Sequence, residues 1–243
     1  MTATLGDASY GRLGNQIIRN IAVSLVADKH DLYVNYAYTE LISKLGIRLF
    51  VGNKIHSETR LLSDTNYFEI LNKEHIDYNL NPNANFFQTK EIINLIYNYI
   101  RSLKTDIIDK NPFKERYNNN KDLIVHIRLS DAAQWNVGLD YYLNSINNIP
   151  FDKLYITTDD VNHIYISRIK SLYENVEIIN YDEIKTLQFA STCKNIILSH
   201  GSFSAVIGYL AFFSKIYFPN YGLASKMWFG DMFSIEGWEN VTS

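Results

Sequence analysis

The sequence of 243 residues has few of the residues that mark several protein classes. Its one cysteine, Cys193, cannot form a disulfide within the chain, so nothing ties the fold to an oxidising compartment. Only 4 prolines and 11 glycines favour regular secondary structure with short connections over a turn-rich β-sandwich. Apolar runs such as 204–213 are much shorter than the roughly 20 residues that span a bilayer. These shortages exclude a disulfide scaffold and a membrane-spanning helix.

The sequence also has no excess of positively charged residues. Lysine and arginine number 23 against 26 aspartates and glutamates, a net charge of -3, so no nucleic-acid partner is expected. Asp7, Arg12 and Arg19 interrupt the N-terminus, which therefore does not resemble a signal peptide. With 47% hydrophobic residues, we expect a globular, cytoplasmic protein without a membrane span, and peripheral membrane contact stays open.

Short apolar runs alternate with helical patterns through the C-terminal half of the chain. The runs end in polar residues, as buried parallel strands do, and repeated units of this size predict a parallel sheet with helices on both faces. The expected strands are 123–128, 154–157, 176–179, 195–198 and 215–218, and the expected helices are 139–146, 164–173, 183–191 and 204–213.

The N-terminal half begins in the same way. A strand is expected at 3–5, a helix at 15–27, a strand at 32–36 and a helix at 88–100, whereas 53–85 has no clear pattern. Polar and proline-containing stretches between 105 and 121 mark a boundary. The sequence therefore predicts an N-terminal lobe of residues 1–115 and a C-terminal lobe of residues 116–243.

Polar residues that follow the predicted strands are the candidates for a site, because ligands of open parallel sheets bind beyond the carboxyl ends of the strands. The glycines of the 6–16 loop let a backbone approach a ligand, and the next helix aims its amino end at an anion. Arg12 and Leu13 stand where a phosphate-binding loop needs Lys and Ser or Thr, and a Gly-x-Gly-x-x-Gly spacing is absent. An ordinary strand-to-helix turn is the alternative.

Segment 126–131 carries a stronger signal. Alternation along a strand puts His126 and Arg128 on one side, and an arginine at a strand end can clamp a phosphate with two parallel hydrogen bonds. The alternative is a surface ion pair between Arg128 and Asp131 beside a structural histidine.

Two further segments end strands. Residues 157–160 suit ribose or base hydroxyls or, alternatively, a helix cap, and the hydroxyls and amides of 199–204 suit a phosphate or a cap. Val206 replaces the second glycine of a hydrolase nucleophile elbow, and no histidines or cysteines pair at metal-ligand spacing, so no metal is expected.

The order of these segments resembles the α-1,2-fucosyltransferase family. The matching segments, spread over about residues 5–220, are Gly11-Arg12-Leu13-Gly14-Asn15-Gln16, Asn85 to Lys90, His126-Ile127-Arg128 with Asp131, Tyr141-Tyr142, Thr158-Asp159-Asp160, Cys193 to Ile197 and Gly201-Ser202-Phe203-Ser204.

The resemblance implies an α/β fold of the GT-B type, two Rossmann-like lobes with parallel sheets, with the acceptor mainly against the N-terminal lobe and the donor in the C-terminal lobe. It implies an inverting transfer of fucose from GDP-fucose to a glycan hydroxyl, without a metal or other cofactor. Arg128 would bind the β-phosphate, and Asp131 or Asp7 is the candidate base. The implied catalytic residues are Arg128 and Asp131, and the implied donor-binding residues are His126, Asp159, Asp160, Ser202, Phe203, Ser204 and, lining the opposite side of the cleft, Gly14, Asn15 and Gln16.

The chain also departs from the family pattern. Leu129 and Ser130 replace the second arginine and the glycine of the His-x-Arg-Arg-Gly-Asp motif, and Arg12 replaces a glycine. Another nucleotide sugar, with a hexose or pentose, therefore stays open as the donor. A catalytically silent nucleotide- or sugar-binding protein and a P-loop-like nucleotide hydrolase are the competing hypotheses.

Overall fold

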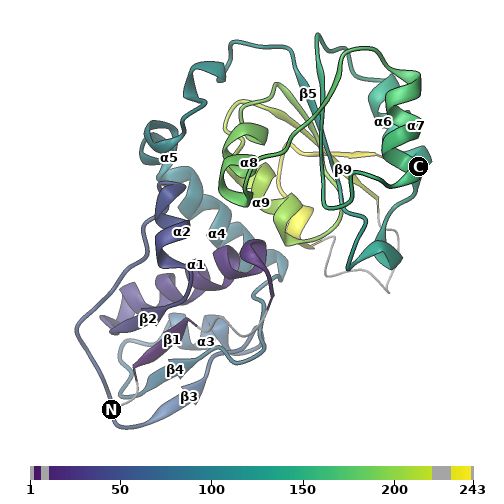
Figure 1. Cartoon of the computed structure of the whole chain (residues 1–243). Coiled ribbons are helices and arrows are strands. Elements are labelled where there is room, and N and C mark those ends of the chain that lie inside the picture. The colour runs from purple at the N-terminus through teal and green to yellow at the C-terminus, as the bar shows by residue number, and fades with distance from the viewer. Residues whose placement is uncertain (1–2, 7–10, 221–230, 242–243) are drawn as a thin grey trace. The chain divides into compact units, whose positions relative to one another are not determined.

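The computed structural model describes residues 3–6, 11–220 and 231–241 (Figure 1). The chain folds as two compact units, Met1–Leu103 and Lys104–Ser243. The lobe boundary expected between 115 and 116 lies later along the chain than this division. None of the described helices is long and apolar enough to cross a bilayer.

The described part of the C-terminal unit is built on a six-stranded sheet in which every pairing is parallel. The strand order is β10-β9-β8-β5-β6-β7, so the chain starts in the middle, runs to one edge, and then returns to run to the other. This is the order of the dinucleotide-binding Rossmann fold. The strands are β5 (Leu123–Ile127), β6 (Leu154–Thr158), β7 (Val176–Ile178), β8 (Asn195–Ile197), β9 (Lys215–Pro219) and β10 (Glu239–Val241).

Helices cover both faces of this sheet. Figure 1 shows α6 (Leu139–Asn147) and α7 (Ile164–Leu172) on one side and α8 (Glu183–Ala190) and α9 (Ser202–Leu210) on the other. Every residue of β5 is buried, which explains why all of its residues except His126 are apolar. The unit also contains α5 (Lys104–Lys110) and the short 3-10 helices Lys114–Arg116 and Ala133–Trp135.

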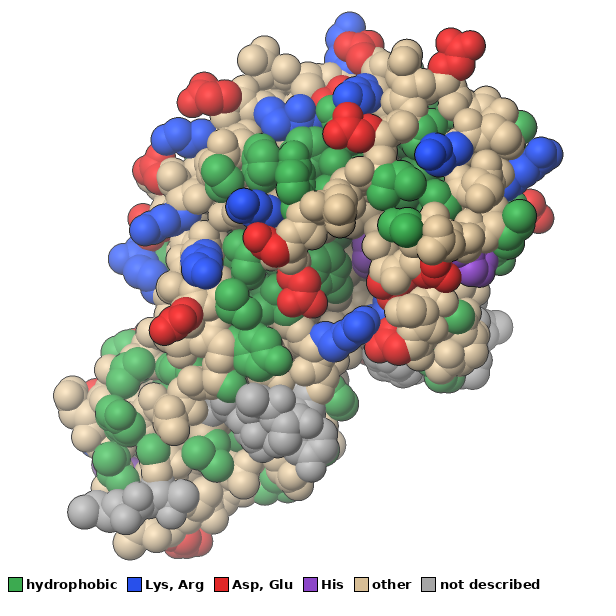
Figure 2. Space-filling model, in the orientation of Figure 1, with side chains coloured by type: hydrophobic (Ala, Val, Ile, Leu, Met, Phe, Trp, Pro, Cys, Tyr) green, Lys and Arg blue, Asp and Glu red, His purple; other side chains and the backbone are tan. Residues whose placement is uncertain are grey.

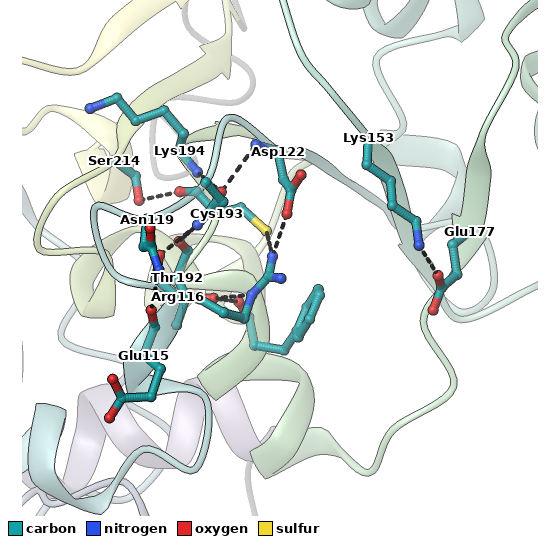
Figure 3. Close-up of polar contacts among 12 residues, drawn as sticks. Glu115, Arg116, Asn119, Asp122, Lys153, Glu177, Thr192, Cys193, Lys194 and Ser214 are labelled. Atoms are coloured by element: carbon teal, nitrogen blue, oxygen red, sulfur yellow. Dashed lines mark hydrogen bonds and ion pairs between the residues drawn. The ribbon is translucent and has the colours of Figure 1, made fainter.

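A cluster around Arg116 joins the amino ends of the two central strands, β5 and β8 (Figure 3). The guanidinium donates to the Asp122 carboxylate at 2.7 Å and to the Thr192 hydroxyl at 3.0 Å, and lies 4.4 Å from the centroid of the Phe189 ring. Burial raises the pKa of the neighbouring Cys193 thiol to about 12. The cluster lies at the edge of the sheet opposite to the carboxyl ends of the strands, so it supports the sheet and leaves the site edge free.

The described part of the N-terminal unit contains two parallel strand pairs, β1 with β2 and β3 with β4, and a helical layer. Helix α1 contacts α3 and α4 and buries Ile17, Ile18 and Ile21, as the helical stripe in the sequence predicts. Its elements are β1 (Thr4–Gly6), α1 (Leu13–His30), β2 (Val34–Tyr36), α2 (Thr39–Lys44), β3 (Thr59–Leu61), α3 (Tyr67–Leu71), β4 (Asn79–Asn81) and α4 (Lys90–Ser102).

The structure corrects some of the expected elements. Strand β10 was not predicted, because two of its three residues, Glu239 and Asn240, are polar and exposed at the edge of the sheet. Helix α9 begins and ends earlier than the predicted 204–213. It starts directly after Gly201, which has a φ of 89°, and stops where Ala211 takes a non-helical ψ of 85°.

Charges of both signs are interspersed on the surface of the C-terminal unit that Figure 2 draws. Lysine and arginine side chains lie among aspartates and glutamates there, in line with the net charge of -3. A ligand of high negative charge must therefore rely on a local site.

Candidate functional site

The site lies where the strand order reverses, between β5 and β8. These strands pair in parallel, so the segments that follow them, 128–131 and 199–204, leave the same edge of the sheet. The chain continues from β5 toward one end of the sheet and from β8 toward the other, and the crevice at such a switch point is where open α/β sheets bind ligands. Two of the four predicted segments thus meet here.

Arg128 lies against the amino end of α9. A Cβ atom added to Gly201 would come within 2.5 Å of the Arg128 Nη1 atom, so only a glycine permits this approach. The φ of 89° at Gly201 also requires glycine. Because α9 starts at the next residue, the guanidinium and the unpaired first amides of the helix lie close together.

The other edge of the Arg128 guanidinium pairs with Asp131. Nε and Nη2 donate to the Asp131 carboxylate at 3.1 to 3.4 Å, so the ion pair that the sequence offered as an alternative is present. The Arg128 side chain is 20% exposed and that of Asp131 50% exposed, so the pair lies at the rim of the site. It leaves Nη1 directed toward Gly201.

His126 and Ser204 lie beneath Arg128, inside the protein. His126 Nδ1 is 2.8 Å from the Ser204 hydroxyl, and that hydroxyl also accepts the backbone N–H of Ser199 at 2.8 Å. The Ser204 hydroxyl thus ties the imidazole of His126 to the backbone of Ser199. Ser204 is fully buried, so it supports the site from within.

The His126 ring is neutral at physiological pH. Burial lowers its pKa to about 3, assisted by the nearby His200 and Arg128 and opposed by Asp159. A neutral ring adds no positive charge beside the guanidinium but keeps an N–H donor. Phe203 packs near it, with the ring centroids 5.5 Å apart.

Asp159, at the end of β6, holds the loop that follows Arg128. Its carboxylate accepts the backbone N–H groups of Leu129 at 2.7 Å and Ser130 at 3.2 Å, and the Ser130 hydroxyl at 2.5 Å. Burial alone would raise the pKa of Asp159, but these hydrogen bonds outweigh it and lower the pKa. Asp159 therefore joins the 126–131 segment, as its place at the sheet edge predicts.

The carboxylate of the neighbouring Asp160 accepts the backbone N–H of Asn162 at 3.0 Å, a bond within the turn that follows β6. The alternative that residues 157–160 cap the next helix is wrong. The cap of α7 is His163, whose Nδ1 accepts from the Tyr165 amide at 3.2 Å.

Asn136 is a site residue that the sequence did not reveal. Its side-chain amide donates to the Arg128 carbonyl at 2.8 Å and to the Tyr142 hydroxyl at 3.1 Å. Its Oδ1 atom accepts the backbone N–H of Gly138 at 2.9 Å, so the Asn-x-Gly pattern before α6 was the available signal.

The predicted residues of the first loop belong to the N-terminal unit. Gly14, Asn15 and Gln16 form the first turn of α1, and the Asn15 Oδ1 atom accepts from the Gln88 amide at 2.9 Å. This bond links two of the segments that carry the family resemblance. Asp7, the second candidate base, lies outside the described residues.

Comparison with solved structures finds proteins of similar fold. In fold, the chain is similar to fucosyltransferase NodZ. NodZ from Bradyrhizobium superposes with a TM-score of 0.52 at 11% identity, over 88% of this chain and 94% of that chain. NodZ α-1,6-fucosyltransferase soaked with GDP-fucose gives 0.51 at 11% identity over 85% and 91%, and the form co-crystallised with GDP gives 0.51 at 10% over 88% and 93%. In sequence, the chain matches no protein-family model and no curated protein.

The likeness to NodZ confirms the predicted fold class, an α/β fold of the GT-B type with parallel sheets. At such low identity it bears on the fold alone. Among the described residues, no group of three or more His, Cys, Asp and Glu side chains is arranged to hold a metal ion.

Proposed function

We propose that the chain is an inverting, metal-independent glycosyltransferase that moves L-fucose from GDP-fucose to a hydroxyl of a glycan acceptor. In this proposal the unit Lys104–Ser243 binds the donor and the unit Met1–Leu103 serves the acceptor. The observation that carries it is the approach of Arg128 to Gly201 at the amino end of α9, at the switch point of a Rossmann sheet. A cation and several amide donors converge there on the place where a diphosphate would lie.

Departure of GDP leaves negative charge on the β-phosphate. That charge would be stabilised by Arg128 Nη1, the first amides of α9 and the Ser202 hydroxyl. Fixed donors of this kind are among the largest contributions to catalysis. The neutral His126 would add no positive charge beside Arg128, and Phe203 would lie beside the nucleotide. Asp159 would act by holding the loop 129–130. Asp160 would contact the ribose or base.

Asp131 is our candidate for the group that removes the acceptor proton. It is half-exposed at the rim of the site, within reach of solvent and of an incoming hydroxyl.

Fucose as the transferred sugar is supported twice. The sequence motifs resemble α-1,2-fucosyltransferases, and the chain shares its fold with an α-1,6-fucosyltransferase that was co-crystallised with GDP and, in another crystal, soaked with GDP-fucose. Both point to GDP-fucose as the donor, and the α-1,2 linkage rests on the motifs alone.

A second candidate function, a catalytically silent nucleotide- or sugar-binding protein, is favoured by Leu129. This residue stands where the family has a second arginine, and its side chain is 5% exposed and packs in the core. The site therefore offers one guanidinium where the family has two.

Replacement of Arg128 by alanine tests the proposal. We expect transfer from GDP-fucose to fall on the order of 10²–10³-fold, because one charge-stabilising donor is lost. The thermal midpoint should change little, since rim ion pairs contribute at most about 1 kcal/mol. Arg168→Ala, an exposed arginine on α7, is the control that removes the same charge elsewhere.

Calorimetric titration of the wild type with GDP, UDP, dTDP and CDP identifies the donor class. The proposal expects a preference for GDP, with product analysis giving the linkage. Full transfer by Arg128→Ala would remove the role of Arg128, and GDP binding without transfer or donor hydrolysis would support the silent binding protein.

A further inference from the structure

We infer that Tyr142 and Asn136 are positioning residues that fix the backbone of Arg128, so that its guanidinium stays against the amino end of α9. The inference rests on the proposed function, because it assigns these residues to the phosphate-binding role of Arg128. Neither residue needs to touch the ligand.

The backbone of Arg128 is held from both sides. Its N–H donates to the Ser199 hydroxyl at 3.3 Å, and its carbonyl accepts the Asn136 side-chain amide at 2.8 Å. The two partners lie on different segments. Ser199 follows β8, and Asn136 lies in the loop before α6. Arg128 has left β5 by this point, so the side-chain bonds replace the strand pairing that fixes His126.

The Tyr142 hydroxyl joins the two sides. It lies 2.8 Å from the Ser199 hydroxyl and accepts from Asn136 at 3.1 Å, which closes a ring of hydrogen bonds around the Arg128 peptide groups. Tyr142 is fully buried on α6, packed edge-to-face on Tyr141 with 5.0 Å between the ring centroids. A buried network with every member bonded makes its geometry stiff.

Stiffness matters here because the guanidinium has little room. Arg128 Nη1 approaches Gly201 so closely that a single methyl group would displace it. Catalytic groups lose much of their effect when they are displaced by about 1 Å. The Tyr142–Asn136 pair thus sets where the positive charge lies relative to α9.

The adjacent tyrosine provides a matched control. Tyr141 is equally buried on the same helix, and its hydroxyl also makes a buried hydrogen bond, to the Leu198 carbonyl at 2.9 Å. Tyr141→Phe and Tyr142→Phe each remove one buried hydroxyl, and both should lower the thermal midpoint. Only Tyr142→Phe breaks the ring around Arg128.

The experiment measures GDP affinity by calorimetry, together with kcat and KM for transfer from GDP-fucose. We expect Tyr142→Phe, which removes the hydroxyl that joins Ser199 to Asn136, to weaken GDP binding about fivefold and to lower kcat as well. Tyr141→Phe should leave both within about twofold of the wild type. If Tyr142→Phe does not fold, Asn136→Ala, in a half-buried loop, opens the same ring.

A double-mutant cycle distinguishes positioning from general structural damage. In the Arg128→Ala background, Tyr142→Phe should cause no further loss of GDP affinity, because the group it positions is gone. A loss of equal size in both backgrounds, or equal GDP affinity in the two tyrosine variants, would overturn this inference and leave the proposed function standing. A wild type that binds no GDP would overturn the proposed function, and this inference with it.

Discussion

His126 shows how far a single residue can be interpreted from the sequence alone. Strand alternation predicts that it lies on the same side as Arg128, and its place at a strand end marks it as a candidate. Its burial and its bond to Ser204 follow from a contact across 78 positions of the chain, which no local pattern contains. The same holds for Asn136, whose bond to the Arg128 carbonyl depends on a loop conformation.

Burial of His126 makes the stability of the protein depend on pH. Its pKa falls from 6.5 to about 3 on folding, so between these values the unfolded chain binds more protons than the folded one. The free energy of unfolding should therefore decrease as pH falls below 6.5, by about 1.4 kcal/mol per pH unit for this group. Asp159, with a lowered carboxyl pKa, loses its own contribution only at lower pH, below 3.8.

Urea unfolding at pH 7, 6, 5 and 4.5 measures this slope, and His126→Asn provides the comparison. The variant should be less stable at pH 7. Below pH 6.5 its free energy of unfolding should decrease less steeply than that of the wild type, by about 1.4 kcal/mol per pH unit. His30, whose pKa is also lowered by burial, contributes to both proteins alike. Parallel slopes for the wild type and the variant would contradict a neutral buried His126.

At the scale of elements, the strands that could be predicted from the sequence are the buried ones. The strands β5, β6 and β8 are buried along nearly their whole length, so they appear as apolar runs and were predicted within a residue or two. Strand β3 has three residues, all exposed, and β4 lies in a polar, asparagine-rich stretch, so neither gives a period in the sequence. The strand order, which creates the switch point, comes from pairings between distant segments.

The amino ends of α6 and α9 allow a test of the contact between Gly201 and Arg128. Gly138 and Gly201 both precede the first residue of a helix and have nearly the same backbone angles, with φ of 92° and 89°. Alanine at either position should cost about 2 kcal/mol of stability through backbone strain. A Cβ at Gly138 meets nothing within 4 Å, whereas at Gly201 it meets Arg128.

Gly201→Ala should therefore reduce GDP affinity and transfer about tenfold or more, since the guanidinium must move, while Gly138→Ala, which puts no atom against Arg128, should reduce them less. Calorimetry with GDP and thermal unfolding of both variants are the measurements. Equal GDP affinity in the two variants would mean that the approach of Arg128 to α9 has no part in binding.

At the scale of the whole molecule, the sequence predicted two α/β lobes. Strands and helices alternate in both halves, and polar, proline-containing stretches between 105 and 121 separate the halves. The fold class was confirmed, although the division of the structure at Leu103 precedes the predicted boundary. The charge of the molecule, near neutrality, leaves binding of a diphosphate to local groups, and Arg128 and the amino end of α9 belong to the C-terminal unit.

Amide hydrogen exchange with and without GDP tests the assignment of donor binding to that unit. We expect slower exchange in the segments 128–131 and 199–204 when GDP is bound, because ligand binding suppresses the local openings through which these amides exchange. Helix α4 and the strands β3 and β4 should exchange at unchanged rates, since they belong to the unit assigned to the acceptor. Arg128→Ala at the same GDP concentration should lose most of the protection, which ties the effect to the site. Protection confined to the unit Met1–Leu103 would reverse the assignment of the two lobes, because the nucleotide would then lie on the side proposed for the acceptor.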